Sequence, residues 1–525
     1  MANGFEHLMN TPQTAIGKGT VGEPPAAPAG KEGVIFKLSL FFDGTLNNRS
    51  NTNKRRGQPG ILSLKGDESS YGNFYSNVAI LEYLNLRNKP ERHEVSVYVE
   101  GIGTVDFSDE LKAQGVADKD NGNDDRQGYA FGSGATGIPG KVTIGINKAK
   151  ARIKKAYDKE EQYVKEIIID VFGFSRGAAA ARHFVSRHHA LRGPWPNQGP
   201  PKLTVNFVGL FDTVSSYEDG GSNLLGVLGN GAQGKIEGIF DDDVKQLGLN
   251  LGGTPRKVVH LAAGDEIREN FSLTTIDSSL DVGKGIELTM PGAHSDVGGG
   301  YAEYAHEEVR RIRSETEKRH LIAEGWYRPD QFRHAYAAST PSIPGKKIII
   351  GEWHIPVFPS ISSYTMSVWE NGIRTLTNRY QYVALALMLD LARRHGRNQA
   401  AEFTEPAGRF ATYQVPTSLR ELCANFLAQA KNKEGKGRGT IVCPPNQLHS
   451  LRNHYLHRSH RSTSEAKIGM GPAPNDKRVL IDDRLLVDKF SVRAKQKVNE
   501  APQRVKGAVG DAMRRAGRAW SGVRQ

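Results

Sequence analysis

The sequence has only two cysteines, Cys423 and Cys443, and it contains no C-x-x-C pair. A disulfide framework and a cysteine-based metal or redox motif are therefore excluded, and we expect two free thiols. No stretch approaches the ~20 consecutive apolar residues that a membrane-spanning helix needs. The N-terminal residues lack the basic start and apolar core of a secretory signal peptide, so we expect secretion by a route without a cleaved leader.

Acidic residues are fewer than basic ones. The 525-residue chain has 57 Asp and Glu against 70 Lys and Arg, which gives a formal net charge of +13. Such an excess favours acidic partners, namely nucleic acid, anionic lipid headgroups or an acidic protein. No recognised nucleic-acid-binding module and no alternation of aromatic and basic residues accompanies the charge, so we expect no nucleic-acid partner. A hydrophobic content of 38% and a mean hydropathy of −0.50 are typical of a soluble globular protein.

Changes in composition divide the chain into three parts. Residues 1–33 are rich in Pro, Gly and Ala and are predicted to form a flexible leader. Residues 34–465 are predicted to form one domain with two insertions, a lid over residues 218–252 and a less regular cap over residues 302–440. Residues 466–525 are predicted to be a basic tail that ends in an amphipathic helix, which would lie on a membrane or dock on a partner.

Short apolar runs alternate with helical patterns along the first part of this domain. Strand-like runs are "GVIFKLSLFF", "HEVSVYV", "EIIIDVF", "KLTVNFVGLF", "KVVHLAA" and "GIELTM", and helical spacing occurs in "FYSNVAILEYLNL", "VTIGINKAKARIKKAYDKEEQYV" and "RTLTNRYQYVALALMLDLARRHG". Nearly continuous apolar strands that alternate with helices favour a parallel sheet covered on both faces. The predicted fold class is therefore α/β, similar to the α/β-hydrolases, with an irregular C-terminal region.

One serine stands between two glycines where a strand-like run becomes a helix-like one, in "EIIIDVFGFSRGAAAARHF". In a G-x-S-x-G turn the serine lies on a sharp bend between strand and helix, and the glycines allow neighbouring elements to approach closely. The bend raises the hydroxyl above the carboxyl ends of the strands. We therefore interpret Ser175 as a nucleophile.

A serine hydroxyl needs a base, and the base needs an orienting acid. In α/β-hydrolases these residues follow the serine in the order acid, then histidine. Asp212 ends the run "VNFVGLFD" and His294 follows the run "IELTMPGA", so both lie where strands end. The sequence therefore predicts a triad of Ser175, Asp212 and His294.

Other residues remain open as the acid or the base. Asp265 and Glu266 follow a further strand, and either is an alternative acid. Asp296 is only two residues beyond His294 and is better suited to shaping the following glycine-rich turn. His457, from the histidine-rich segment "LHSLRNHYLHRSH", is the main alternative base. The same histidines are a weak metal-site candidate, and without partnered cysteines or spaced carboxylates we expect no metal.

Backbone amides near the serine are candidates for an oxyanion hole. Arg176 follows the nucleophile at the start of a helix, where its N–H points toward developing negative charge. A second donor usually comes from a loop after an early strand, and Gly44 or Thr45 in "FFDGTLNN" is predicted to supply it.

Four motifs in order, "FFDGTLNN", "FGFSRGAAAARHF", "GLFDTVSS" and "PGAHSDVGGGY", resemble those of the type VI secretion antibacterial lipase effectors of the first family. The resemblance extends from Val34 to Tyr301, about half of the chain, and "HSDVGGGY" beside "GFSRGA" is its most specific part. It implies the same three residues, Ser175, Asp212 and His294, as the triad.

The resemblance also implies a biological role. It implies a phospholipase that attacks membrane lipids in the periplasm of rival bacteria, travels on the secretion spike and is neutralised in the producing cell by an immunity protein. We expect hydrolysis of carboxylic esters in glycerophospholipids without a cofactor, and a soluble serine esterase on the same fold is the alternative. The apolar, glycine-rich run "NLLGVLGNGAQGKIEGIF" suits a mobile cover over a lipid-binding cleft.

Overall fold

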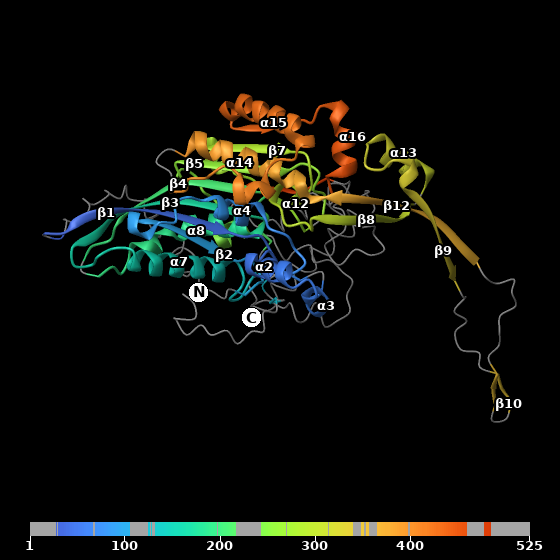
Figure 1. Cartoon of the computed structure of the whole chain (residues 1–525), viewed down its shortest axis with the longest axis horizontal. Helices are drawn as coiled ribbons and strands as arrows, with labels where there is room; N and C mark the ends of the chain where they lie inside the picture. The colour runs from blue at the N-terminus through green and yellow to red at the C-terminus, as the bar shows by residue number, and fades with distance from the viewer. Residues whose placement is uncertain are drawn as a thin grey trace, which may run out of the picture.

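A seven-stranded parallel sheet organises the part of the chain that the computed structural model describes (Figure 1). Its strand order is β13-β7-β5-β4-β3-β1-β2, and every neighbouring pair is parallel. The strands are β1 (Glu32–Phe42), β2 (Glu94–Val99), β3 (Gln162–Phe174), β4 (Lys202–Phe211), β5 (Lys257–Ala263), β7 (Gly285–Met290) and β13 (Arg438–Thr440). The described residues are 28, 30–66, 69–105, 124–125, 128, 132–196, 198–216, 243–268, 270–312, 314–339, 348–350, 353–355, 365–396, 400–458 and 477–484.

The central strands are apolar on both sides because both faces of the sheet are covered. In β3, Ile167, Ile169 and Val171 belong to one hydrophobic core, and Phe172 and Phe174 belong to the other. Successive side chains of a strand point to opposite faces, so a strand buried on both faces has an almost continuous apolar sequence. The pattern that predicted a covered parallel sheet is thus explained.

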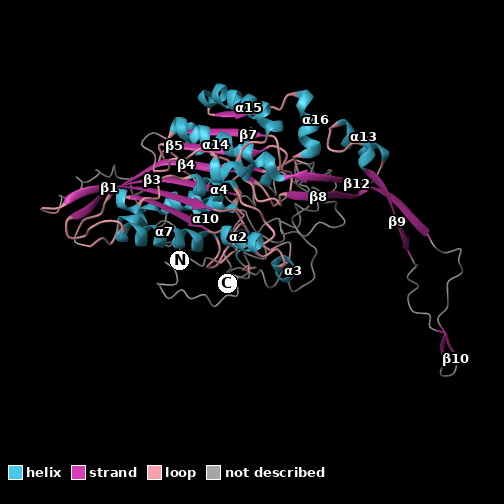
Figure 2. Ribbon diagram, viewed as in Figure 1, coloured by secondary structure: helices cyan, strands magenta, loops and turns pink. Residues whose placement is uncertain are grey.

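Helices form a layer on each face (Figures 1 and 2). On one face, α8 (Arg176–Arg187) packs on β1 and β3, and α7 (Ile138–Lys155) packs on β2 and α8. On the other face, α14 (Gln381–His395) packs on β4 and β5, and it also contacts α4 (Asn77–Leu84) and α15 (Arg420–Lys433). The predicted α/β class is confirmed.

Two predicted helices have different limits in the structure. The helix predicted from residue 142 to residue 164 is α7, which begins at Ile138 and ends at Lys155, because Gln162 already starts β3. The helix predicted from residue 374 begins at Gln381, since the preceding residues complete β12. Gly396 is the C-cap of α14, as the sequence predicted, and its N–H is bonded to the carbonyl of Ala392.

The region from residue 302 to residue 440 contains more regular structure than its sequence indicates. An antiparallel sheet with the order β8-β12-β9 extends away from the parallel sheet, and its long strands β9 and β12 are visible at the right of Figure 1. The strands are β8 (Tyr304–Ile312), β9 (Phe332–Ser339) and β12 (Thr365–Thr377). Its strands lack the nearly continuous apolar sequence of the parallel strands, and β8 ("YAHEEVRRI") is mostly charged or polar, so the sequence does not indicate this sheet.

The remaining elements are short. They are the helices α2 (Arg49–Gly57), α3 (Ile61–Lys65), α10 (Asp243–Leu247), α11 (Asp277–Asp281), α12 (His294–Gly298), α13 (Glu315–Ala323) and α16 (Pro445–His454), and the strands β6 (Leu273–Thr274), β10 (Ile348–Ile350), β11 (Trp353–Ile355) and β14 (Leu480–Ile481). β14 pairs with β6 in parallel, so residues 477–484, which the sequence assigns to the basic tail, pack against the domain.

Three predicted segments lie mostly or wholly outside the described residues. They are most of the leader, residues 218–242 of the predicted lid (218–252), and residues 485–525 with the predicted amphipathic helix. Among the residues that the structure does describe, no helix is long and apolar enough to cross a membrane.

Candidate active site

Ser175 lies at a sharp bend between the end of β3 and the start of α8. Its φ of 58° and ψ of −130° fall outside the regions that non-glycine residues usually adopt. A Cβ at Gly173 would lie 2.5 Å from the carbonyl oxygen of Gly177, and a Cβ at Gly177 would lie 2.2 Å from the carbonyl oxygen of Asp43. Both glycines are therefore required by the close approach of strand, helix and the loop after β1, as the motif predicts.

The structure brings Ser175, His294 and Asp212 into one chain of hydrogen bonds. His294 Nε2 lies 2.7 Å from Ser175 Oγ, and His294 Nδ1 lies 2.5 Å from Asp212 Oδ2. All three side chains are buried, and they come from the carboxyl ends of β3, β4 and the segment after β7. This geometry allows the imidazole to accept the serine proton while the carboxylate holds the opposite ring nitrogen.

Asp212 is held by more than the histidine. Its Oδ1 accepts the N–H of Ala263, and both carboxylate oxygens accept hydrogen bonds from the guanidinium of Arg478, at 2.6 and 2.8 Å. Burial alone would raise the pKa of Asp212, but Arg478 and His294 hold that pKa well below its usual value. Asp212 is therefore ionised in the resting site.

His294 is the first residue of α12, and aromatic rings surround its imidazole. The ring of Phe174 lies 4.6 Å from the imidazole centroid, and the ring of Phe271 meets it edge-on at 5.0 Å. Burial lowers the pKa of His294 below its ordinary value, and its bond to Asp212 offsets part of that effect. The ring is thus kept neutral and able to act as a base near neutral pH.

A second ion pair lies beside His294, and it contains Glu266, which the sequence offered as an alternative acid, and Arg268, which sequence reasoning did not select. Glu266 accepts the backbone N–H of His294 at 3.2 Å and two hydrogen bonds from the side chain of Arg268. Burial opposes ionisation, yet the guanidinium of Arg268 lowers the pKa of Glu266 to about 2. Arg268 in turn lies over the ring of Phe271, 3.4 Å from its centroid. The pair therefore fixes the start of α12 and one aromatic neighbour of the imidazole.

The remaining alternative acid and the alternative base lie in other interactions. Asp265 accepts the N–H of Gly292 and so joins the ends of β5 and β7. His457 donates its backbone N–H to Asp296 and pairs its Nδ1 with the same carboxylate at 2.8 Å. The ring of His457 stacks on Tyr301, 3.8 Å between centroids. His457 and Asp296 thus form a pair of their own, and Asp212 is the carboxylate bonded to the ring of His294.

The other histidines of that segment are dispersed. His454 Nδ1 lies 3.0 Å from the carbonyl of Ser450 within α16, and His449 contacts the backbone at Gly325. His460 lies outside the described residues.

The predicted oxyanion donors lie around the bend. A Cβ at Gly44 would lie 2.6 Å from Cδ1 of Phe174, so the loop after β1 approaches the end of β3 closely. The N–H of Gly44 donates to its neighbour Asp43 at 2.7 Å, and the Nε of Arg176 donates to Thr45 Oγ1 at 2.9 Å. The side chain of Arg176 therefore links the two segments that are predicted to supply the donors.

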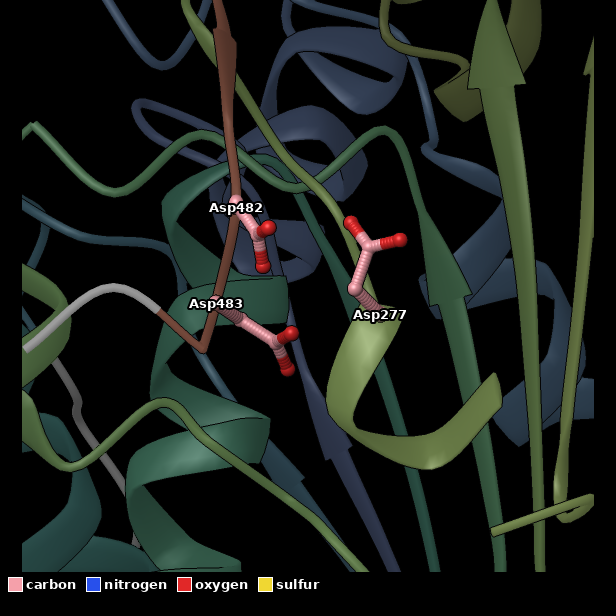
Figure 3. A group of neighbouring side chains, drawn as sticks. All are labelled: Asp277, Asp482 and Asp483. Atoms are coloured by element: carbon pink, nitrogen blue, oxygen red, sulfur yellow. The ribbon is translucent and has the colours of Figure 1, made fainter. Parts of the chain in front are cut away.

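One group of carboxylates in the described part of the chain has the spacing of metal ligands. Asp277 at the start of α11 and Asp482 and Asp483 after β14 have oxygens within 4.8 Å of one another (Figure 3). Each is engaged by an arginine, Asp277 by Arg438, Asp482 by Arg484 and Asp483 by Arg182. These ion pairs account for the cluster, so it does not indicate a metal site.

One part of the chain matches the model of a known protein family. Residues 196–321, which include Asp212 and His294, match the family model of the type VI secretion phospholipase effector Tle1-like catalytic domain. The predicted resemblance to the first family of secreted lipase effectors is thereby confirmed. No curated protein matches the sequence.

Two solved structures are similar to the chain. The structure of the Tle1 effector bound to the VgrG spike of the type VI secretion system matches with a TM-score of 0.54 and 21% identity, over 86% of this chain and 94% of the other. At that identity the match establishes the fold. An uncharacterized protein from Pseudomonas aeruginosa matches with a TM-score of 0.37 and 15% identity, over 80% of this chain and 53% of the other.

Proposed function

We propose that this chain, which carries the Tle1-like phospholipase effector catalytic region and has the fold of a Tle1 effector, is a serine-dependent phospholipase that hydrolyses carboxylic esters of glycerophospholipids. The observation that carries the proposal is the hydrogen-bonded series Ser175–His294–Asp212, with the serine on a bend between strand and helix. This arrangement suits acyl transfer.

The reaction proceeds in two steps. Ser175 attacks the ester carbonyl while His294 Nε2 takes the serine proton, and the same nitrogen then protonates the departing alkoxide. His294 then takes a proton from a water molecule, which attacks the acyl-enzyme; the bond between the acyl carbon and Ser175 Oγ breaks, His294 returns the proton to Oγ, and the fatty acid is released. Asp212 stays ionised throughout and stabilises the imidazolium that forms in each step.

Negative charge that develops on the carbonyl oxygen requires donors. We assign these to the backbone N–H of Arg176, at the first position of α8, and to the backbone of Thr45 in the loop after β1, since the N–H of Gly44, the other predicted donor, already donates to Asp43. Removal of one such donor typically costs about 3 kcal/mol of transition-state stabilisation.

The net charge of +13 supports a membrane substrate, since basic residues near anionic headgroups each contribute roughly 1 kcal/mol of attraction. Residues 243–252, the described end of the predicted lid (218–252), pack in the core against α8. Within the predicted cap (302–440), α14 and β13 belong to the helix layer and the parallel sheet of the domain, so the proposed cap is limited to residues 302–377. Residues 466–525 are proposed to contact a membrane or a partner. Residues 34–465 form the proposed catalytic domain, and residues 1–33 the leader.

Delivery completes the proposal. The similar Tle1 effector is bound to a VgrG spike, and we propose that this chain is carried by a spike protein in the same way. It would act as an antibacterial toxin in the periplasm of target cells, and a cognate immunity protein would protect the producer.

The nucleophile is tested by Ser175→Ala. We expect this variant to lose phospholipid hydrolysis and periplasmic toxicity while its thermal unfolding stays close to that of the wild type, because the change removes one hydroxyl. Release of fatty acid from vesicles and growth of cells that export the protein are the measurements. Activity retained by Ser175→Ala would remove the serine from its role.

The substrate class is tested by mass spectrometry of the products from a defined mixed-acyl phospholipid. Release of a free fatty acid and a lysophospholipid is expected, and the identity of the acyl chain reports the position cut. Turnover of short soluble esters alone would favour the alternative, a soluble serine esterase on the same fold.

A further inference from the structure

The segment of residues 477–484, here named the C-terminal strap, lies against the site although it is far away in sequence. Its strand β14 pairs with β6, and Leu273 donates its backbone N–H to the carbonyl of Val479. The backbone of Thr274 in β6 donates in turn to the carbonyl of Thr213, which follows Asp212. Backbone hydrogen bonds thus connect the strap to the turn that carries the acid.

Arg478 is the residue by which the strap reaches that acid. Its guanidinium binds both oxygens of Asp212, and its Nε donates to the carbonyl of Phe271 at 2.6 Å. The ring of Phe271 packs against His294. Arg478 therefore holds the partner of the imidazole and one wall of its pocket together.

A bidentate arginine is favoured here for an electrostatic reason. The carboxylate of Asp212 is fully buried, and a buried charge without a partner costs several kcal/mol. His294 is neutral in the resting site and does not compensate that charge. Arg478 does so, and its planar fork also fixes the direction of the carboxylate.

We propose that Arg478 is a positioning residue of the hydrolytic site, which the strap brings into the domain to orient and neutralise the carboxylate that holds His294. This inference rests on the proposed function only in that it takes Ser175, His294 and Asp212 as the reacting groups. It extends the hydrolytic unit beyond residue 465, into the region that the sequence assigned to the tail.

The charges that face His294 show what loss of Arg478 would do. Asp212 and Glu266 are negative, and Arg268 and Arg478 are positive, so the charges of these four side chains sum to zero. Asp296, on the same helix, is engaged by His457. Without Arg478 the surroundings of the ring carry an excess negative charge, which favours the imidazolium and raises the pKa of His294.

The test is the pH dependence of Ser175 labelling by a fluorophosphonate in the full-length protein, because labelling needs an activated serine and no lipid. Arg478→Gln should move the acidic limb of the labelling rate upward by about one pH unit. Arg478→Lys keeps the positive charge but loses the bidentate guanidinium. The acidic limb of its pH profile should therefore stay near that of the wild type, while its labelling rate falls. Arg484→Gln is the matched control, because Arg484 lies on the same strap, is half-exposed and binds only Asp281 and Asp482 among the described residues.

The outcomes separate the two claims. A slower Arg478→Gln variant with an unmoved limb would reduce Arg478 to a structural contact and overturn the inference. If Arg478→Gln does not fold, Arg478→Lys tests the inference instead. Labelling of Arg478→Lys at the rate of the wild type would overturn the inference. A wild-type protein that is labelled at Ser175 but cleaves no phospholipid contradicts the proposed function and leaves this inference standing.

Discussion

At the level of single residues, the proposed chemistry depends on a choice between two histidine–carboxylate pairs. His294 joins Asp212 to the serine, whereas His457 joins Asp296 to the segment after α16. Both pairs are buried, and both involve residues near the glycine-rich turn. Their contacts differ, because only the first ring is bonded to Ser175 in the described structure.

Alanine substitution distinguishes the two rings. His294→Ala should lower kcat by at least about 10³-fold, because general acid–base catalysis is lost with the imidazole. His457→Ala should keep turnover far above that of His294→Ala, since His457 bonds Asp296 and stacks on Tyr301 instead. Fatty-acid release from vesicles measures both. A more severe loss in His457→Ala than in His294→Ala would reverse the assignment of the base.

The pH profile reports the environment of the same ring. The neutral imidazole is the base, and burial lowers the pKa of His294 below the ordinary value of 6.5. Activity should therefore be fully present at neutral pH and fall only as the pH drops through that lowered pKa. The acidic limb of kcat/KM should lie below 6.5, and circular dichroism over the same range controls for unfolding. A limb above 6.5 would contradict this sign.

At the level of elements, the site depends on how closely α12 approaches the end of β3. Gly298 ends α12, and a Cβ there would lie 1.9 Å from Cε2 of Phe174. Phe174 immediately precedes the serine, and its ring packs against His294. Packing of this helix on this ring therefore sets the position of the imidazole.

Gly298→Ala tests this packing. The added methyl should force Phe174 aside and lower the free energy of unfolding by about 2 kcal/mol, as overpacking of a core typically does. Hydrolysis should fall further than stability accounts for, because the displaced ring contacts His294. Gly435→Ala is the control, since a Cβ at Gly435 meets nothing within 4 Å. Equal unfolding free energies for the two variants would contradict the expectation.

At the level of the whole molecule, the C-terminal strap packs against α8, the helix that follows Ser175. Asp483 of the strap binds Arg182 of α8 at 2.8 Å, and both side chains are completely buried. Asp483 also accepts hydrogen bonds from the backbone and hydroxyl of Ser278. The strap therefore stabilises the domain as well as supplying Arg478.

Asp483→Asn should lower the free energy of unfolding by about 3 kcal/mol, because it leaves the buried guanidinium of Arg182 without a compensating charge. Asp482→Asn is the matched control. The carboxylate of Asp482 is next to Asp483 in sequence, but it is more exposed and binds the half-exposed Arg484. Urea unfolding of both variants measures the difference. A loss no larger than that of the control would show that the strap contributes little to stability.

Much of the site could be predicted from the sequence because its signals are local. One short segment of the sequence predicts the strand, bend and helix around Ser175. Asp212 and His294 were selected because each follows a strand and because they occur in the order acid, then histidine; they lie together in the structure. Buried strands of a parallel sheet are apolar whatever their partners, so the α/β class followed from the same pattern.

The tertiary structure alone decided which distant charges meet. Nothing near Arg478 in sequence marks it as the partner of an aspartate 266 residues earlier. The position of Glu266 after a strand marked it as a candidate acid, but its pairing with Arg268 has no recognisable pattern. The separation of His457 from Ser175 was also open until the chain was folded. The strength of an ion pair depends on the distance between its charges and on their burial, and neither can be read from a short stretch of sequence. Backbone preference and apolar periodicity, in contrast, act between residues that are close in sequence.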